Sequence, residues 1–237
     1  PGHSRRGVRF SGLPIGALCA KFLLLLPFFG LQLFYSLHPR PFLRNFPSMS
    51  DIAHQLEWIS RLVAFDTTSS KSNFALIEDV EVYFHGLGVE TFRVENDEGT
   101  KSNLYAVVGP KVEGGVVLSG HTDVVPVTGQ DWKSDPWTVI ERDGKLYGRG
   151  VADMKSFSAI GLSLVPQMVA AGLKRPVIFA LSYDEELGCL GAPRMIAEIA
   201  GKVPAPSAVI VGEPTSMKVI DGHKGIGSFR VTVTGYT

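Results

Sequence analysis

The 237-residue sequence contains only two cysteines, Cys19 and Cys189. So few cysteines imply no disulfide framework and fit a reducing compartment, so we expect a cytoplasmic protein. The chain also lacks an excess of charge, because 23 lysines and arginines balance 23 aspartates and glutamates. Without a basic block, the sequence gives no indication of a nucleic-acid-binding surface, and we expect no nucleic-acid partner.

Residues 49–237 also lack internal repeats and low-complexity linkers. The glycine-containing stretch GRGVAD, residues 148–153, does not have the glycine spacing of a dinucleotide-binding fingerprint. Hydrophobic residues make up 45% of the chain, which is ordinary for a globular protein that buries a core.

The first 48 residues differ from the rest. Three arginines, at positions 5, 6 and 9, precede the apolar run LPIGALCAKFLLLLPFFGLQLFYSL, a pattern similar to a signal peptide or a membrane anchor. Lys21 and Pro27 interrupt this run, no clean small-residue cleavage site follows, and a good helix start comes directly after Met49. We expect residues 1–48 to be an atypical leader outside the fold. The alternative is a genuine targeting segment of a membrane-associated protein, but residues 49–237 are expected to have no membrane contact.

From Met49 onwards, predicted helices alternate with short apolar runs that are typical of buried strands. Strands are predicted within residues 89–96, 103–109, 114–120, 175–182 and 207–212, and helices within 50–64, 73–88, 148–172 and 192–200. A hairpin is predicted to turn at Asp143-Gly144, and the third helix is expected to kink at Pro166. The alternation predicts an α/β fold with a mostly parallel sheet flanked by helices. Residues 227–235 alternate between apolar and polar instead, which is typical of a half-exposed strand in an antiparallel sheet.

Three of the predicted strands are followed by acids or a histidine. The stretch SGHTDVVP places His121 after one strand, Asp184 to Glu186 follow another, and Glu213 follows a third. Because ligands of open α/β sheets bind beyond the carboxyl ends of the strands, we expect these side chains to share one site. Taken singly they would be a loop histidine, a solvated acidic turn and a surface glutamate. Together, one histidine and several carboxylates form a ligand set for zinc or a similar divalent metal.

Their spacing suggests separate tasks. Asp123, two residues after His121, is placed to accept the second ring N–H of the histidine, although a simple turn residue is the alternative. Asp153 precedes a helix, where it can act as an N-cap or can bridge two metal ions about 3.5–4 Å apart. Glu185 and Glu186 are adjacent, so their side chains diverge. One of them can bind metal while the other holds the attacking water.

Four stretches, SGHTDVVPV, DPWTVIERDGKLYGRGVADMKSFSA, LSYDEELGCLGA and VIVGEPT, together resemble one family. This is the zinc-dependent amidohydrolase family of aminoacylase, carboxypeptidase G-type enzymes, succinyl-diaminopimelate desuccinylase and acetylornithine deacetylase. The resemblance covers residues 50–237 and is greatest to acetylornithine deacetylase, especially in TGQDWKSDPW, YGRGVADMK and SYDEELGCLG.

The resemblance implies a centre of two divalent metal ions, zinc in the first place. A ligand set of carboxylates with few histidines would also accept cobalt or manganese. It implies that His121 and Glu213 each bind one ion terminally, that Glu186 completes the set and that Asp153 bridges the two ions. It further implies that Glu185 is the general base, which later protonates the leaving amine, and that Asp123 orients His121.

The resemblance also implies a catalytic domain, residues 49–224, into which a smaller α/β dimerisation domain is inserted. Residues 225–237 would then be the start of that second domain, cut off, and the complete enzyme would be a homodimer. The family supplies two further histidines, one a metal ligand, and none of the six histidines here fits the late ligand position. His223 is instead expected to be a structural or cleft-edge residue. We therefore interpret the chain as the N-terminal portion of an enzyme, inactive by itself.

The activity that the resemblance implies is removal of the acetyl group from N-acetyl-L-ornithine, a small N-acyl amino acid of arginine biosynthesis. The alternatives within enzymes are a desuccinylase and a broader aminoacylase or dipeptidase. An alternative of another class is a non-catalytic binding protein that keeps the fold. Every metal-ligand position of the family that falls within this sequence carries a residue able to bind metal, which favours the enzyme.

Overall fold

The computed structural model describes residues 49–222, 224, 225, 227 and 231–235. Residues 49–214 belong to one compact unit, and the described residues beyond Pro214 belong to another. The predicted leader and His223 lie outside the described residues. Of the strand predicted over 227–235, residues 228–230 also lie outside them, and residues 231–235 form no strand. The start of a second domain in this segment therefore stays a prediction.

The helices of the first unit lie where the sequence predicts them. They are α2 (Met49–Val63), α3 (Phe74–Gly86), α4 (Ser156–Ser163), α5 (Val165–Ala170) and α6 (Ala192–Lys202). The break expected near Pro166 falls at Leu164, between α4 and α5, because proline suits only the first turn of a helix. None of the described helices combines the length and the hydropathy that crossing a membrane requires.

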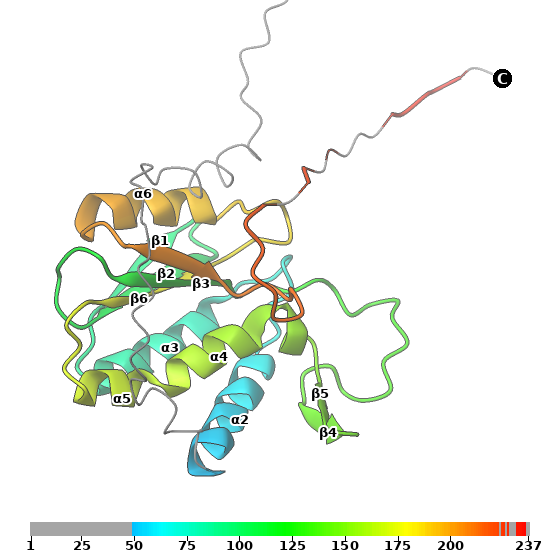
Figure 1. The fold of residues 1–237 in the computed structure, drawn as a ribbon. Helices are drawn as coiled ribbons and strands as arrows, with labels where there is room; N and C mark the ends of the chain where they lie inside the picture. The colour runs from blue at the N-terminus through cyan, green and yellow to red at the C-terminus, as the bar shows by residue number, and fades with distance from the viewer. Residues whose placement is uncertain (1–48, 223, 226, 228–230, 236–237) are drawn as a thin grey trace, which may run out of the picture. The chain divides into compact units, whose positions relative to one another are not determined.

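A five-stranded sheet forms the centre of the unit (Figure 1). Its strands are β1 (Thr91–Glu95), β2 (Ser102–Val108), β3 (Val116–His121), β6 (Val177–Ser182) and β7 (Ala208–Val211), in the order β1-β2-β6-β3-β7. Strand β3 is parallel to both β6 and β7, whereas β2 is antiparallel to both β1 and β6. Four strands thus point the same way, which confirms a mostly parallel sheet flanked by helices.

The predicted hairpin is also present, as β4 (Ile140–Arg142) and β5 (Lys145–Tyr147). Both central residues of its turn, Asp143 and Gly144, have positive φ, at 54° and 67°. A two-residue turn with φ above zero at both positions matches the right-handed twist of antiparallel strands.

Both faces of the sheet are covered, as Figure 1 shows: α6 packs on one face, and α3 and α4 pack on the other. Strand β6 is apolar from Val177 to Leu181 because its side chains alternate between two covered faces. Phe179 packs edge to face on Phe84 of α3, with ring centroids 5.4 Å apart. The next side chain, Ala180, belongs to the smaller cluster around Met195 of α6.

Strand β7 does not fit the expectation that all the apolar runs are buried. Ile210 and Val211 are each 49% exposed. The reason is its position at the end of the sheet order, where a strand pairs on one side only. Its hydrophobicity alone does not distinguish this edge strand from the central strands β3 and β6.

Two valines on α3 provide a matched test of the core. Val80 is fully buried, whereas Val82 is 69% exposed. We predict that Val80→Ala lowers the free energy of unfolding by about 2 kcal/mol, because two buried methyl groups are lost. Val82→Ala should change it by less than about 0.5 kcal/mol. Urea denaturation followed by circular dichroism measures both, and equal losses for the two variants would contradict the packing described.

Candidate metal centre

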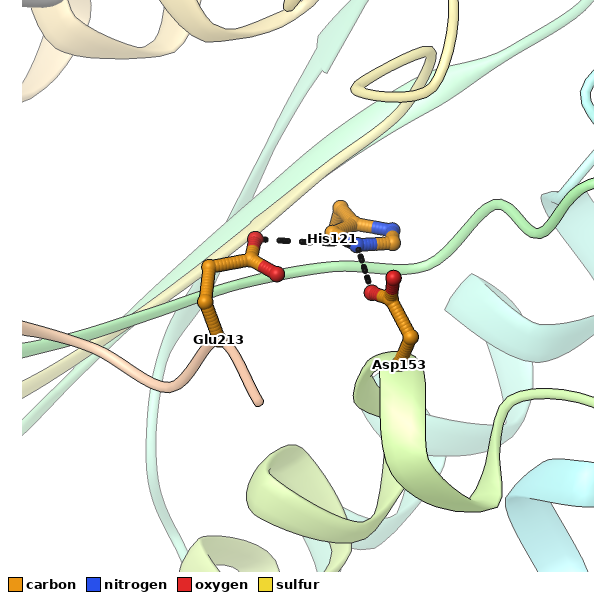
Figure 2. Close-up of side chains that lie close together, drawn as sticks. All are labelled: His121, Asp153 and Glu213. Atoms are coloured by element: carbon orange, nitrogen blue, oxygen red, sulfur yellow. Dashed lines mark hydrogen bonds and ion pairs between the residues drawn. The ribbon is translucent and has the colours of Figure 1, made fainter. Parts of the chain in front are cut away.

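His121, Asp153 and Glu213 come together at the carboxyl ends of the parallel strands (Figure 2). His121 is the last residue of β3, and Glu213 follows β7 by two residues. His121 Nε2 lies 3.0 Å from Asp153 Oδ1 and 3.8 Å from Glu213 Oε1. The imidazole is buried, but the side chains of Asp153 and Glu213 are 47% and 36% exposed. The three groups therefore converge where solvent and small molecules can reach them.

Asp153 reaches this group from an irregular turn, Val151–Lys155, that precedes α4. The interpretation of Asp153 as a helix N-cap is wrong, since α4 begins only at Ser156 and no side-chain capping bond forms. Lys155 fixes the end of this turn, because its side chain is buried and its ammonium donates a hydrogen bond to the Phe65 carbonyl at 2.7 Å. Asp153 is thus held toward His121 and not toward the helix.

The second ring nitrogen of His121 contacts Asp123, though not chiefly through the carboxylate that the sequence suggested. Nδ1 lies 2.8 Å from the main-chain oxygen of Asp123 and 3.5 Å from its Oδ1. An N–H at Nδ1 that donates to this carbonyl leaves the Nε2 lone pair available for a cation. The carboxylate of Asp123 instead accepts hydrogen bonds from Ser69 Oγ and from the amides of Glu185 and Glu186.

The adjacent glutamates differ in their contacts, as expected for neighbouring side chains that diverge. Glu185 Oε2 lies 3.9 Å from His121 Nε2, and Glu185 Oε1 accepts a contact from Cys189 Sγ at 3.4 Å. Glu186 is not part of the group formed by His121, Asp153 and Glu213. Glu185, the predicted base, thus lies nearer to His121 than Glu186, the predicted metal ligand. Both roles stay predictions.

The site has an excess of negative charge. Burial, together with the carboxylates of Asp153 and Glu185, raises the pKa of Glu213 to about 7, although the nearby His121 opposes this shift. The pKa of Glu186 is raised for the same reasons. Burial by itself lowers the pKa of His121, but the carboxylates of Asp123 and Glu185 raise it to about 9. One imidazole among crowded carboxylates fits a bound divalent cation, which would satisfy these donors and relieve their repulsion.

Sequence reasoning missed two polar residues that support the site. Ser69 hydrogen-bonds Asp123 Oδ2 at 2.8 Å from a position 54 residues away. Buried Asn103 donates to the Gly191 carbonyl and accepts from the Tyr183 amide. It therefore holds both ends of the segment from Tyr183 to Gly191, which contains Asp184, Glu185 and Glu186. Ser69 stands in the serine-rich loop DTTSSKSN, and nothing local distinguishes it from its neighbours.

Comparison with known proteins places the chain in a family. The model of peptidase family M20/M25/M40 matches residues 117–235, which include His121, Asp153 and Glu213. The chain belongs to this family. It is 39% identical to the acetylornithine deacetylase of Pasteurella multocida over 195 residues, which cover 79% of this chain and 50% of that protein. It is 37% identical to that of Vibrio vulnificus over 189 residues, covering 80% and 49%. The chain thus spans about half the length of these curated relatives.

Two solved structures share the fold of this family member. Human carnosine dipeptidase 1 superposes with a TM-score of 0.58 at 22% identity, over 68% of this chain and 39% of that one. An M20 family metallo-carboxypeptidase from Sulfolobus solfataricus gives 0.55 at 22% identity, over 67% and 37%. At this identity the likeness concerns the fold, and it confirms the α/β catalytic-domain architecture.

Gly212 provides a test of how Glu213 is positioned. A Cβ atom at residue 212 would lie 2.0 Å from Cγ of Phe157, whereas one at Gly201 on α6 would meet nothing within 4 Å. We predict that Gly212→Ala moves Glu213 away from His121 and weakens Zn²⁺ binding about 10- to 100-fold. Gly201→Ala should leave zinc affinity unchanged. Competition with a chromophoric chelator measures both affinities, and an unchanged affinity in Gly212→Ala would contradict this placement.

Proposed function

We propose that this family member is a metal-dependent amide hydrolase that releases acetate from N-acetyl-L-ornithine. The observation that carries the proposal is the group of His121, Asp153 and Glu213 at the carboxyl edge of the sheet. The names of the relatives at 37–39% identity support the substrate. Because the chain spans about half of those relatives, the activity is proposed for the protein that contains this chain.

The proposed cofactor is a pair of divalent ions, with zinc first and cobalt as an alternative. His121 and Glu213 would hold one ion each, Asp153 would bridge them, and Glu186 would complete the set. Asp153 is suited to bridging because its Oδ1 faces His121 Nε2 while its half-exposed side chain leaves the second oxygen accessible. When bound, such ions polarise the amide carbonyl and lower the pKa of water.

Glu185 is the proposed general base. Its carboxylate lies at the edge of the group, 3.9 Å from His121 Nε2, and its side chain is 36% exposed. It can therefore accept a proton from the attacking water and deliver that proton to the departing amine. Asp123 binds the Glu185 amide at 3.0 Å and contacts the His121 ring, so it fixes the base relative to the ligand.

A second candidate is a broader dipeptidase or aminoacylase, or a desuccinylase. The candidate metal ligands His121, Asp153 and Glu213 would serve the hydrolysis of other linear amides equally well, which favours this alternative more than a non-catalytic protein. A cytoplasmic location rests on the scarcity of cysteine, and a homodimer rests on the family resemblance.

Metal removal and a substrate panel test the proposal. Protein expressed from its native gene and treated with a chelator should lose hydrolysis, and Zn²⁺ or Co²⁺ should restore it, because the acids and His121 then regain their cation. N-acetyl-L-ornithine should have the highest kcat/KM in a panel with N-succinyl-diaminopimelate and N-acetylmethionine. A higher kcat/KM for either competitor would contradict the substrate, and activity that survives complete metal removal would contradict the mechanism.

Glu185→Gln tests the proton-transfer role. The amide cannot accept the proton of water, so kcat should fall by about 10²- to 10⁴-fold while the protein keeps its metal content. The exposed glutamate Glu98 is the control, and Glu98→Gln should have the kcat of the unmodified protein. Kinetics and elemental analysis of the same samples give both quantities. Near-normal turnover in Glu185→Gln would show that another group is the base.

A further inference from the structure

Lys101 and Asp184 form an ion pair next to the candidate site. Lys101 Nζ lies 2.6 Å from Asp184 Oδ1, and their side chains are only 14% and 10% exposed. Every other lysine or arginine pair with a carboxylate in the described part of the chain leaves both partners at least 21% exposed. Removing two charges from water costs about as much as their attraction returns. Stability alone is therefore a weak reason for this pair, and its contacts are more informative.

Lys101 extends from a well-fixed turn. It directly precedes β2, its amide donates to Asn96 Oδ1 at 2.9 Å, and its carbonyl accepts from the Asn96 amide at 3.0 Å. Its ammonium donates a second hydrogen bond to the Ser69 carbonyl at 2.5 Å. The ammonium thus joins two segments that are distant in sequence, the loop around Ser69 and the turn that begins at Asp184.

Asp184 determines the direction of the acidic turn. Its φ of 54° lies in the left-handed region, which non-glycine residues adopt only where surrounding contacts hold them. Immediately after this reversal, the amides of Glu185 and Glu186 point at the carboxylate of Asp123, at 3.0 Å and 3.3 Å. The carbonyl of Asp184 accepts a hydrogen bond from the Leu190 amide, which closes the turn. A contact that holds the Asp184 side chain therefore also orients the two glutamates that follow.

Ser69 gives Lys101 a second route to the same centre. The Ser69 carbonyl accepts from Lys101, and the Ser69 hydroxyl donates to Asp123 Oδ2 at 2.8 Å. The two partners of Lys101 are thus directly linked to the groups around His121. Asp184 is adjacent in sequence to Glu185, and Ser69 is hydrogen-bonded to Asp123. The ammonium also places a positive charge beside a turn that carries three consecutive acids, where it offsets their mutual repulsion.

We propose that Lys101 is a positioning residue for the acidic turn Asp184–Glu186. It does not contact the reacting atoms. Its ion pair with Asp184 and its hydrogen bond to Ser69 hold Glu185 and Glu186 in the orientation that metal binding and proton transfer require. This inference rests on the proposed function, because it assigns the turn the task described there.

The test compares Lys101→Met with Lys111→Met in protein expressed from its native gene. Lys111 forms an exposed ion pair with Glu90 at 3.5 Å, so the same chemical change is made away from the site. Lys101→Met should lower kcat and weaken Zn²⁺ binding, each about 10- to 100-fold, with KM unchanged. Lys111→Met should match the unmodified protein. All assays are made well below the melting temperature of each variant, so that unfolding does not contribute.

A double-mutant cycle shows whether Lys101 acts through Asp184. Asp184→Asn should cause a loss of kcat similar to that of Lys101→Met, and the double variant should lose no more than either single variant. If Lys101→Met does not fold, the double variant is measured in its place, because it leaves no buried charge without a partner. A double variant with lower kcat and weaker Zn²⁺ binding would then support the proposal, and one with unchanged values would overturn it. Full additivity, or a folded Lys101→Met with unchanged kcat and zinc affinity, would overturn the proposal.

The zinc affinities separate this inference from the proposed function. If the unmodified protein hydrolyses none of the substrates in the panel, the proposed activity fails. Weaker Zn²⁺ binding in Lys101→Met, but not in Lys111→Met, would still support the positioning role. Equal zinc affinity in those two variants would overturn it.

Discussion

The parallel register of β3 with its two neighbours is the constraint on which the candidate site depends. His121 pairs with Ser182 of β6, and Ser119 pairs with Val211 of β7. Two residues further along β3 and the β7 segment, His121 and Glu213 stand level, which accounts for their 3.8 Å approach. A slip of one residue would turn every side chain of a strand to the opposite face and separate these groups. The buried apolar side chains of β3 and β6 therefore fix the geometry of the charged residues at their ends.

Asp123 links the separate segments of the site through hydrogen bonds. One residue contacts the imidazole through its main-chain oxygen, the acidic turn through its carboxylate, and the Ser69 loop through the same carboxylate. Burial by itself raises the pKa of Asp123, yet these hydrogen bonds and the histidine lower it, so the carboxylate stays ionised. A buried polar network of this kind is rigid only when each member is satisfied, which explains why residues far apart in sequence are committed to it.

The sequence was sufficient to predict the helices, the positions of the apolar strands along the chain and the convergence of His121 and Glu213, because all of these follow from local periodicity and from strand direction. The edge position of β7 was not predictable, since an apolar run carries no information about the order of strands in a sheet. Nor was the hydrogen bond from His121 to the Asp123 carbonyl. That hydrogen bond forms because the carboxylate of Asp123 already accepts from the amides of Glu185 and Glu186. The position of these amides depends on the left-handed backbone conformation of Asp184, which the sequence does not reveal.

Anomalous diffraction at the zinc absorption edge, from crystals grown with Zn²⁺, tests the central claim most directly. The account predicts an anomalous peak about 2.0–2.1 Å from His121 Nε2 and a second peak beside the Glu213 carboxylate, with carboxylate oxygens of Asp153 within reach of both. Zinc bound elsewhere, with no peak between these three side chains at saturating Zn²⁺, would contradict it.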